Sequence, residues 1–140
     1  MAGARQGWRE APYITTPALL ADVAAGAIAV DYEGRDVRIL PGVAQTSNGA
    51  EDVMRGEETQ LLGAGMQDGM VCIPGTHSKW VSLQDSTVTH FNTFMTGELF
   101  AVLGTHSILQ HGVTPGAQIA PDGPAFLEAV REMQADGAAL

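Results

Sequence analysis

The chain has 140 residues, with 16 acidic and 7 basic side chains and a formal net charge of −9. Hydrophobic residues make up 45% of a composition typical of folded proteins, and without a lysine and arginine cluster nucleic-acid binding is not expected. The single cysteine, Cys72, excludes an internal disulfide, and no apolar run approaches the ~18 residues of a membrane span, so we expect a cytoplasmic protein without a secretory signal.

Residues 2–10 carry polar and aromatic side chains before any strand or helix pattern begins. Arg5, Gln6 and Trp8 could hydrogen-bond to and stack on a polyol or carboxylate ligand. A solvated chain terminus explains the same composition equally well. The residues alone leave both interpretations open.

The next segment predicts architecture rather than a site. Thr16, followed by a proline, predicts a helix start with Thr16 as the N-cap, and Gly26 predicts the end of that helix. Short β-type runs at residues 27–30 and 37–40 predict a hairpin.

A second helix is predicted directly after Gly56, within residues 52–64. Glu57 and Glu58 fall in its first turn, where the helix dipole favours carboxylates. Such acidic residues are ordinary at a helix start. The functional alternative is that one carboxylate points into a cleft and takes a proton from a substrate hydroxyl.

Residues 71–81 predict two apolar strands joined by a tight turn at Pro74-Gly75. The positions after this turn carry two hydroxyls, an imidazole and an ammonium, on Thr76, His77, Ser78 and Lys79. With exposed backbone N–H groups, these side chains form a candidate cradle for phosphate oxygens. A solvated hairpin tip is the plain alternative.

A third strand at residues 87–94 completes a predicted antiparallel meander, with Val88 on its buried face. Thr96 predicts the cap of a helix that runs to about Gly104, whose apolar side should pack on the meander. That apolar side consists of Leu99, Val102 and Leu103.

The last helix is predicted from Pro124, with an apolar stripe that we expect in the core, formed by Phe126, Leu127, Val130 and Met133. Upstream of it, His106 and His111 do not share a helical face, so no histidine metal site is predicted. The sequence contains none of the common G-x-x-x-x-G-K-[ST], G-x-S-x-G, G-x-G-x-x-G or C-x-x-C motifs.

Several segments across nearly the whole chain share their order and spacing with one family. They are G-A-R-Q-G-W-R-E-A-P-Y (3–13), D-V-M-R-G-E-E-T-Q (52–60), P-G-T-H-S-K-W (74–80), F-M-T-G-E-L-F (94–100) and H-S-I-L (106–109). Together they resemble the 2-keto-3-deoxygalactonate kinases, also called 2-dehydro-3-deoxygalactonokinases.

The resemblance implies an α/β, actin-like ATPase (ribonuclease-H-like) sugar kinase fold whose two lobes close on ATP and a sugar acid. Residues 1–68 would be the end of the N-terminal, sugar-binding lobe with the inter-lobe helix. Residues 69–140 would begin the C-terminal, nucleotide-binding lobe. The implied reaction transfers the γ-phosphoryl group of ATP, with Mg²⁺, to the terminal hydroxyl of 2-dehydro-3-deoxy-D-galactonate, which gives the 6-phosphate.

The resemblance also implies site residues. The second phosphate-binding turn would consist of Gly75, Thr76, His77, Ser78 and Lys79. The catalytic base would be Glu57, which directly follows a glycine, with Glu58 and Asp52 as the other candidates. The sugar acid would be bound by Arg5, Gln6, Trp8 and Arg55. No residue of this chain is predicted as a metal ligand.

The chain also departs from the family pattern. Family members are much longer and begin with a D-x-G-T-type phosphate turn, which does not occur here, and Met1 resembles an internal position. We therefore expect a middle slice of the fold that contains parts of both lobes. The alternative is a truncated, inactive fragment that acts as a binding or oligomerising module, since exposed sheet edges and apolar surface favour association of copies.

Overall fold

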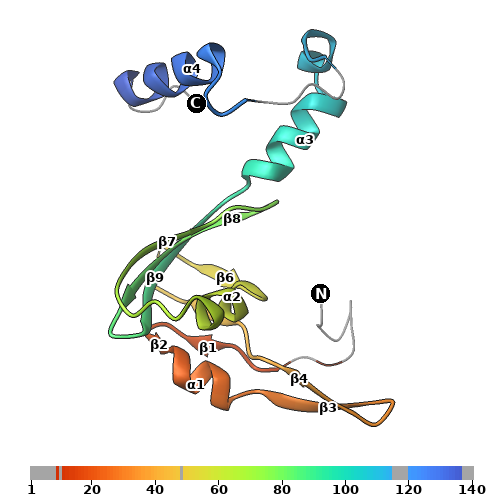
Figure 1. Ribbon diagram of the computed structural model, residues 1–140, viewed down its shortest axis with the longest axis vertical. Coiled ribbons are helices and arrows are strands. Elements are labelled where there is room, and N and C mark those ends of the chain that lie inside the picture. The colour runs from red at the N-terminus through yellow and green to blue at the C-terminus, as the bar shows by residue number, and fades with distance from the viewer. Residues whose placement is uncertain (1–8, 10, 48, 115–119, 137–140) are drawn as a thin grey trace. The chain divides into compact units, whose positions relative to one another are not determined.

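The computed structural model of the chain describes residues 9, 11–47, 49–114 and 120–136 (Figure 1). The chain divides into two compact units, Met1–Phe100 and Ala101–Leu140. The first unit combines sheets with helices and confirms the predicted α/β class, whereas the second is helical in its described part. Across these described ranges, no helix is long and apolar enough to cross a membrane.

The elements follow one another closely along the chain. The first unit contains β1 (Ile14–Thr15), β2 (Ala18–Leu19), α1 (Leu20–Ala25), β3 (Ile28–Tyr32), β4 (Arg35–Ile39), β5 (Val43–Gln45), β6 (Asp52–Met54), α2 (Glu57–Ala64), β7 (Gly69–Ile73), β8 (Ser78–Gln84) and β9 (Thr87–Phe94). Helix α3 (Thr96–His106) begins in the first unit and ends in the second, which also holds η1 (Ile108–Gly112) and α4 (Pro124–Asp136).

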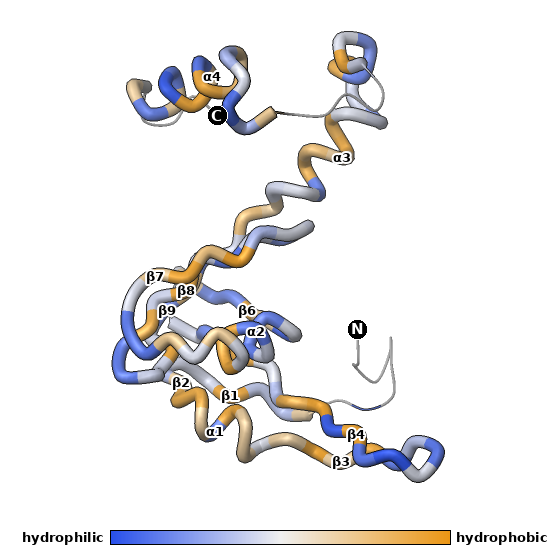
Figure 2. The backbone as a smooth tube through the Cα atoms, in the orientation of Figure 1, coloured by the Kyte–Doolittle hydropathy of each residue, from blue (hydrophilic) through white to orange (hydrophobic). Residues whose placement is uncertain are grey.

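A four-stranded antiparallel sheet with the order β2-β9-β8-β7 forms the centre of the first unit. Strands β7, β8 and β9 are the predicted meander, which the structure confirms. Val81 on β8 lies opposite Val71 on β7 and Phe91 on β9. Val81, Val88 and Phe91 are fully buried, so alternate residues of these strands form the core. Figure 2 shows the hydrophobic residues along these strands.

A smaller sheet with the order β1-β5-β6 is joined to the meander through a buried side chain, Gln45. Strand β2 pairs only with Thr87 and Val88 of β9, so it does not reach Phe91. Here the Gln45 amide takes the place of a strand: its Oε1 accepts from the Phe91 N–H at 3.0 Å and its Nε2 donates to the Phe91 carbonyl at 3.2 Å. The same Nε2 donates to the carbonyl of Ala50 at 2.5 Å.

The helix start predicted at Thr16 is wrong. Residues on both sides of Thr16 add to sheets as β1 and β2, and α1 begins at Leu20 with Leu19 at the N-cap position. Pairing with β5 and β9 therefore overrides the local capping signal. The end of the helix at Gly26 and the β3–β4 hairpin are confirmed.

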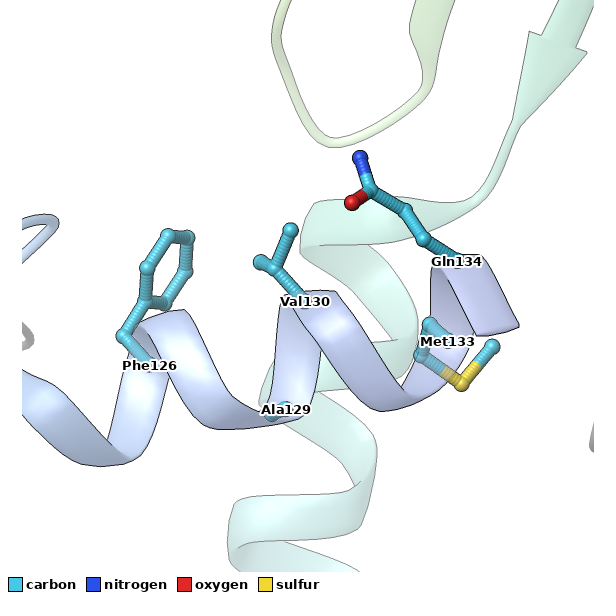
Figure 3. Close-up of a pocket in the computed structure, with 5 residues that line it drawn as sticks. All are labelled: Phe126, Ala129, Val130, Met133 and Gln134. Carbon is cyan, nitrogen blue, oxygen red and sulfur yellow. The ribbon is translucent and has the colours of Figure 1, made fainter. Parts of the chain in front are cut away.

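The apolar faces that we predicted to be buried on the later helices are largely exposed. Leu99 of α3 is 50% exposed, and no residue of α3 is buried. The apolar stripe of α4 is between 37% and 47% exposed at Phe126, Leu127, Val130 and Met133. Along α4, Phe126, Val130 and Met133 line an open apolar groove with Ala129 and Gln134 (Figure 3). The sequence period identified the apolar faces but not what covers them.

We expect Gln45→Met, which keeps the side-chain length, to lower the free energy of unfolding of the full-length protein by about 2 kcal/mol, because it leaves the N–H and C=O of Phe91 buried without their partner. Urea denaturation measures the change. The matched control is Gln84→Met on the exposed end of β8. Equal losses in the two variants would contradict the bridging role of Gln45.

Candidate active site

Two segments that the sequence singled out meet at one cleft in the first unit. One segment is the start of α2 with the two residues before it, which contributes Arg55, Gly56, Glu57 and Gln60. The other is the end of β7 with the connection to β8, which contributes Ile73, Pro74, Gly75, Thr76 and His77. The cleft has a volume of about 360 Å³, which is within the range of small-molecule sites. We call residues 74–78 the cleft loop.

The start of α2 depends on a glycine and two carboxylates. Gly56 at the N-cap has a φ of 114°, a backbone conformation that side-chain-bearing residues rarely adopt. Glu57 Oε2 accepts from the Arg55 N–H at 3.0 Å, and Glu58 Oε2 accepts from the Gly56 N–H at 2.6 Å. The predicted acidic first turn is confirmed, and both carboxylates satisfy backbone donors near the helix start.

The two glutamates differ in their access to the cleft. Glu57 lines the cleft, whereas Glu58 is only 3% exposed and is not among the lining residues. Burial raises the pKa of Glu58, and the hydrogen bonds from the backbone of Glu58 and Gly56 offset only part of this effect. Of the two carboxylates, Glu57 is therefore the one that a ligand in the cleft can reach.

Lys79 lies behind the cleft loop and forms an ion pair with Glu57. Its Nζ is 3.4 Å from Glu57 Oε1, and its side chain is only 5% exposed. Lys79 belongs to β8, opposite Ile73 of β7 and Thr93 of β9. A cation at this depth requires a compensating charge, which Glu57 supplies from the first residue of α2.

The cleft loop presents some of its predicted phosphate ligands to the cleft and holds others behind it. Gly75, Thr76 and His77 are exposed and line the cleft. Ser78 is buried, and its Oγ accepts from the Gly75 N–H at 3.2 Å. Ser78 is thus a buried side chain that holds the loop backbone at Gly75. Lys79 is a buried side chain that holds the Glu57 carboxylate.

Arg55 lines the cleft but is anchored to the segment before β1. Its guanidinium carbon is 4.3 Å from the centroid of the Tyr13 ring, and its Nε donates to Tyr13 Oη at 3.1 Å. Its Nη2 donates to the carbonyl of Ala11 at 3.1 Å. A Cβ on Gly42 would lie 2.5 Å from the Tyr13 ring, so Gly42 provides the space for Tyr13.

Other predicted site residues lie outside the cleft or outside the described part of the chain. Asp52 Oδ1 accepts from the Val53 N–H at 2.8 Å and from Thr93 Oγ1 at 2.7 Å, which ties β6 to β9. Arg5, Gln6 and Trp8 are not among the residues that the structure describes. Within the described ranges, no group of three or more His, Cys, Asp or Glu side chains could hold a metal ion.

Sequence reasoning missed two parts of the site. It did not connect Tyr13 with Arg55, which are far apart in the chain, and it treated residues 96–98 only as a helix start. The structure places residues 96–98 against the cleft loop, where Glu98 Oε2 is 2.5 Å from His77 Nε2. The signal in the sequence was that Tyr13 and Glu98 both fall in segments that resemble the kinase family.

Comparison with known proteins gives the cleft a context. The sequence model of the family described as 2-keto-3-deoxy-galactonokinase matches residues 1–140. A Rhizobium meliloti protein assigned as a 2-dehydro-3-deoxygalactonokinase is 56% identical over 134 residues, which cover 93% of this chain and 44% of the relative. The Escherichia coli 2-dehydro-3-deoxygalactonokinase is 37% identical over 130 residues, covering 91% of this chain and 44% of the relative.

A crystal structure from Sinorhizobium meliloti, also described as a 2-dehydro-3-deoxygalactonokinase, superposes with a TM-score of 0.88 at 53% identity. The match covers 98% of this chain and 46% of that protein. The chain therefore spans less than half the length of the relatives that it matches. Since the family match extends over all of its residues, the chain belongs to the 2-keto-3-deoxy-galactonokinase family.

Proposed function

We propose that the complete protein to which this sequence corresponds is a cytoplasmic, ATP-dependent kinase that converts 2-dehydro-3-deoxy-D-galactonate to its 6-phosphate on an actin-like, two-lobed fold. In this proposal residues 1–68 form the last part of the N-terminal lobe, and residues 69–140 form the first part of the C-terminal lobe. The observation that carries the proposal is the cleft in which the Glu57 carboxylate and the cleft loop lie on opposing segments. The names of the relatives supply the substrate class.

The geometry suits phosphoryl transfer because that reaction requires mainly positioning and charge stabilisation. ATP supplies the phosphoryl group, and the exposed backbone of Gly75 and Thr76 with the His77 imidazole forms a polar surface for its phosphate oxygens. Lys79 is buried and would not need to touch ATP: its positive charge would attract the phosphates, and its ion pair would keep Glu57 in position. Gly75, Thr76, His77, Ser78 and Lys79 remain the proposed ATP-binding residues.

The described residues do not by themselves form a magnesium site. Glu57 is the carboxylate of the cleft, and its oxygens are engaged by Lys79 and by the backbone N–H of Arg55. Mg²⁺ commonly uses one or two carboxylates together with substrate phosphates. We therefore propose that Mg²⁺ binds with the phosphates of ATP and with ligands outside the described residues, and no proton or phosphoryl step here depends on a metal ligand from these residues.

Glu57 is the proposed general base for the sugar hydroxyl. It lines the cleft and is held at a defined position by Lys79 and the Arg55 N–H, as a base in phosphoryl transfer requires. Glu58 is buried, and Asp52 is bonded to Thr93 on the neighbouring sheet. Among the proposed sugar-acid ligands Arg5, Gln6, Trp8 and Arg55, Arg55 lines the same cleft and carries the charge that a carboxylate substrate would pair with.

We expect Glu57→Gln in the full-length enzyme to lower kcat by about 10²–10⁴, the usual share of general-base catalysis. A coupled assay of ADP release with the sugar acid as acceptor measures the change. Glu51→Gln is the matched control, because Glu51 is exposed and contacts only the loop at Gly49 in the described hydrogen bonds. Retained turnover in Glu57→Gln, with loss in Glu58→Gln or Asp52→Asn, would assign the base to another carboxylate.

We expect Glu58→Gln to retain turnover and to change the pH dependence of stability. The pKa of Glu58 is raised above 4.5 in the folded protein, so its stabilising contribution is present below pH 4.5 and is lost as pH rises through the folded pKa. Glutamine cannot lose a proton, so the unfolding free energy of the variant should rise relative to that of the wild type as the pH rises from 4.5 through the raised pKa of Glu58. Urea denaturation across this window tests it, and a pH-independent difference would contradict it.

A second candidate function follows from the apolar surfaces. The groove along α4 in Figure 3 and the half-exposed Leu99 on α3 are features of a module that associates through apolar contacts. In this alternative the 140-residue chain is an inactive binding or oligomerising fragment. The kinase proposal itself assigns activity to the longer protein and not to this part alone.

We expect the isolated 140-residue chain to consume no ATP in the presence of the sugar acid, because it spans under half the length of its kinase relatives. The full-length protein assayed in parallel should consume ATP only with the acceptor present. Sedimentation analysis of the short chain then distinguishes a monomer from an oligomer. Turnover by the short chain alone would show that these residues contain a complete catalytic site.

A further inference from the structure

We infer that the first turn of α3, residues 96–98, is a positioning element that sets the shape of the cleft loop for its ligand. This inference rests on the proposed function, in which the cleft loop contacts phosphate. Thr96, Gly97 and Glu98 do not line the cleft, so they would act through the loop and not on substrate directly.

Successive residues of the cleft loop are each bonded to this turn. The Thr76 carbonyl accepts from the Glu98 N–H at 3.1 Å, and His77 Nε2 is 2.5 Å from Glu98 Oε2. The hydroxyls of Ser78 and Thr96 are hydrogen-bonded to each other. The turn therefore holds the loop through one backbone hydrogen bond, one imidazole–carboxylate contact and one hydroxyl–hydroxyl hydrogen bond. A loop held by these different contacts keeps one arrangement.

Gly97 makes this arrangement possible because it has no side chain. A Cβ at Gly97 would lie 2.7 Å from the Gly75 carbonyl oxygen and 2.9 Å from Thr76 Cα. Both atoms belong to the loop backbone, so no side-chain rotation could relieve the contact. Any residue other than glycine at this position must push the helix and the loop apart.

The short contact with Glu98 also fixes the ring of His77. His77 lines the cleft, and its Nε2 is engaged by Glu98. A ligand in the cleft would therefore contact the other ring nitrogen, Nδ1. Glu98 is thus a positioning residue for His77, and Gly97 is a positioning residue for the loop backbone.

The test compares Gly97→Ala with Gly104→Ala in the full-length protein. Gly104 lies on the same helix, and a Cβ there would meet no heavy atom within 4 Å. We expect Gly97→Ala to accelerate amide hydrogen exchange in a peptide covering residues 74–79. It should also lower kcat/KM for ATP by up to about 10²-fold, the scale of a displacement of about 1 Å, with KM for the sugar acid unchanged. Gly104→Ala should change neither readout.

Glu98 supplies a second variant that does not depend on packing at Gly97. We expect Glu98→Ala to raise KM for ATP and Glu98→Gln to recover part of this loss, because glutamine keeps an acceptor for His77 but not the charge. If Gly97→Ala fails to fold, this pair still tests the inference. Partial recovery by glutamine would support positioning, and identical kinetics in the two Glu98 variants and the wild type would overturn it.

The exchange measurement separates this inference from the proposed function. Unchanged exchange in residues 74–79 of Gly97→Ala would overturn the positioning role whatever the enzyme does. Faster exchange with unchanged ATP kinetics would support positioning of the loop while it contradicts phosphate binding by the loop. Equal losses for ATP and the sugar acid would overturn the inference, because they would indicate a general structural defect.

Discussion

The ion pair between Glu57 and Lys79 is the contact on which the site depends. It joins the first residue of α2 to the middle strand of the meander, and so connects the two segments that form the cleft. Because Lys79 is nearly buried, its charge would be costly without Glu57 nearby. The same pair holds the carboxylate that we propose as the base, so stability and chemistry share one interaction.

Elements with strong local signals were predictable from sequence. Glycines at the turns and alternating apolar residues predicted the β7–β8–β9 meander, and Gly56 with the acidic pair after it predicted the start of α2. The start of α1 was not predictable from Thr16, because sheet pairing by its neighbours outweighs a capping preference. The exposure of α3 and α4 was also missed, since periodicity identifies an apolar face but not its partner.

The candidate site was partly predictable for a similar reason. The cleft loop and Glu57 come from short contiguous motifs, so the family resemblance could single them out. The Tyr13–Arg55 and His77–Glu98 contacts join residues far apart in the chain, and no spacing rule connects them. The burial of Lys79 was not visible either, because a lysine next to a turn ordinarily extends into solvent. Local sequence therefore predicted which side chains are candidates for the site, whereas long-range packing determines which of them line the cleft and which are buried behind it.

The side chain of Gln45 has a mechanical consequence for the first unit. Its amide imitates one peptide group of a missing strand at Phe91, and Asp52 adds a single bond to Thr93 on the same strand. The two sheets share one apolar core, and the hydrogen bonds of Gln45 and Asp52 join them in place of a continuous strand ladder. Because few hydrogen bonds cross between the sheets, a small tilt of one sheet against the other would strain these side-chain contacts and leave the strand pairing within each sheet intact.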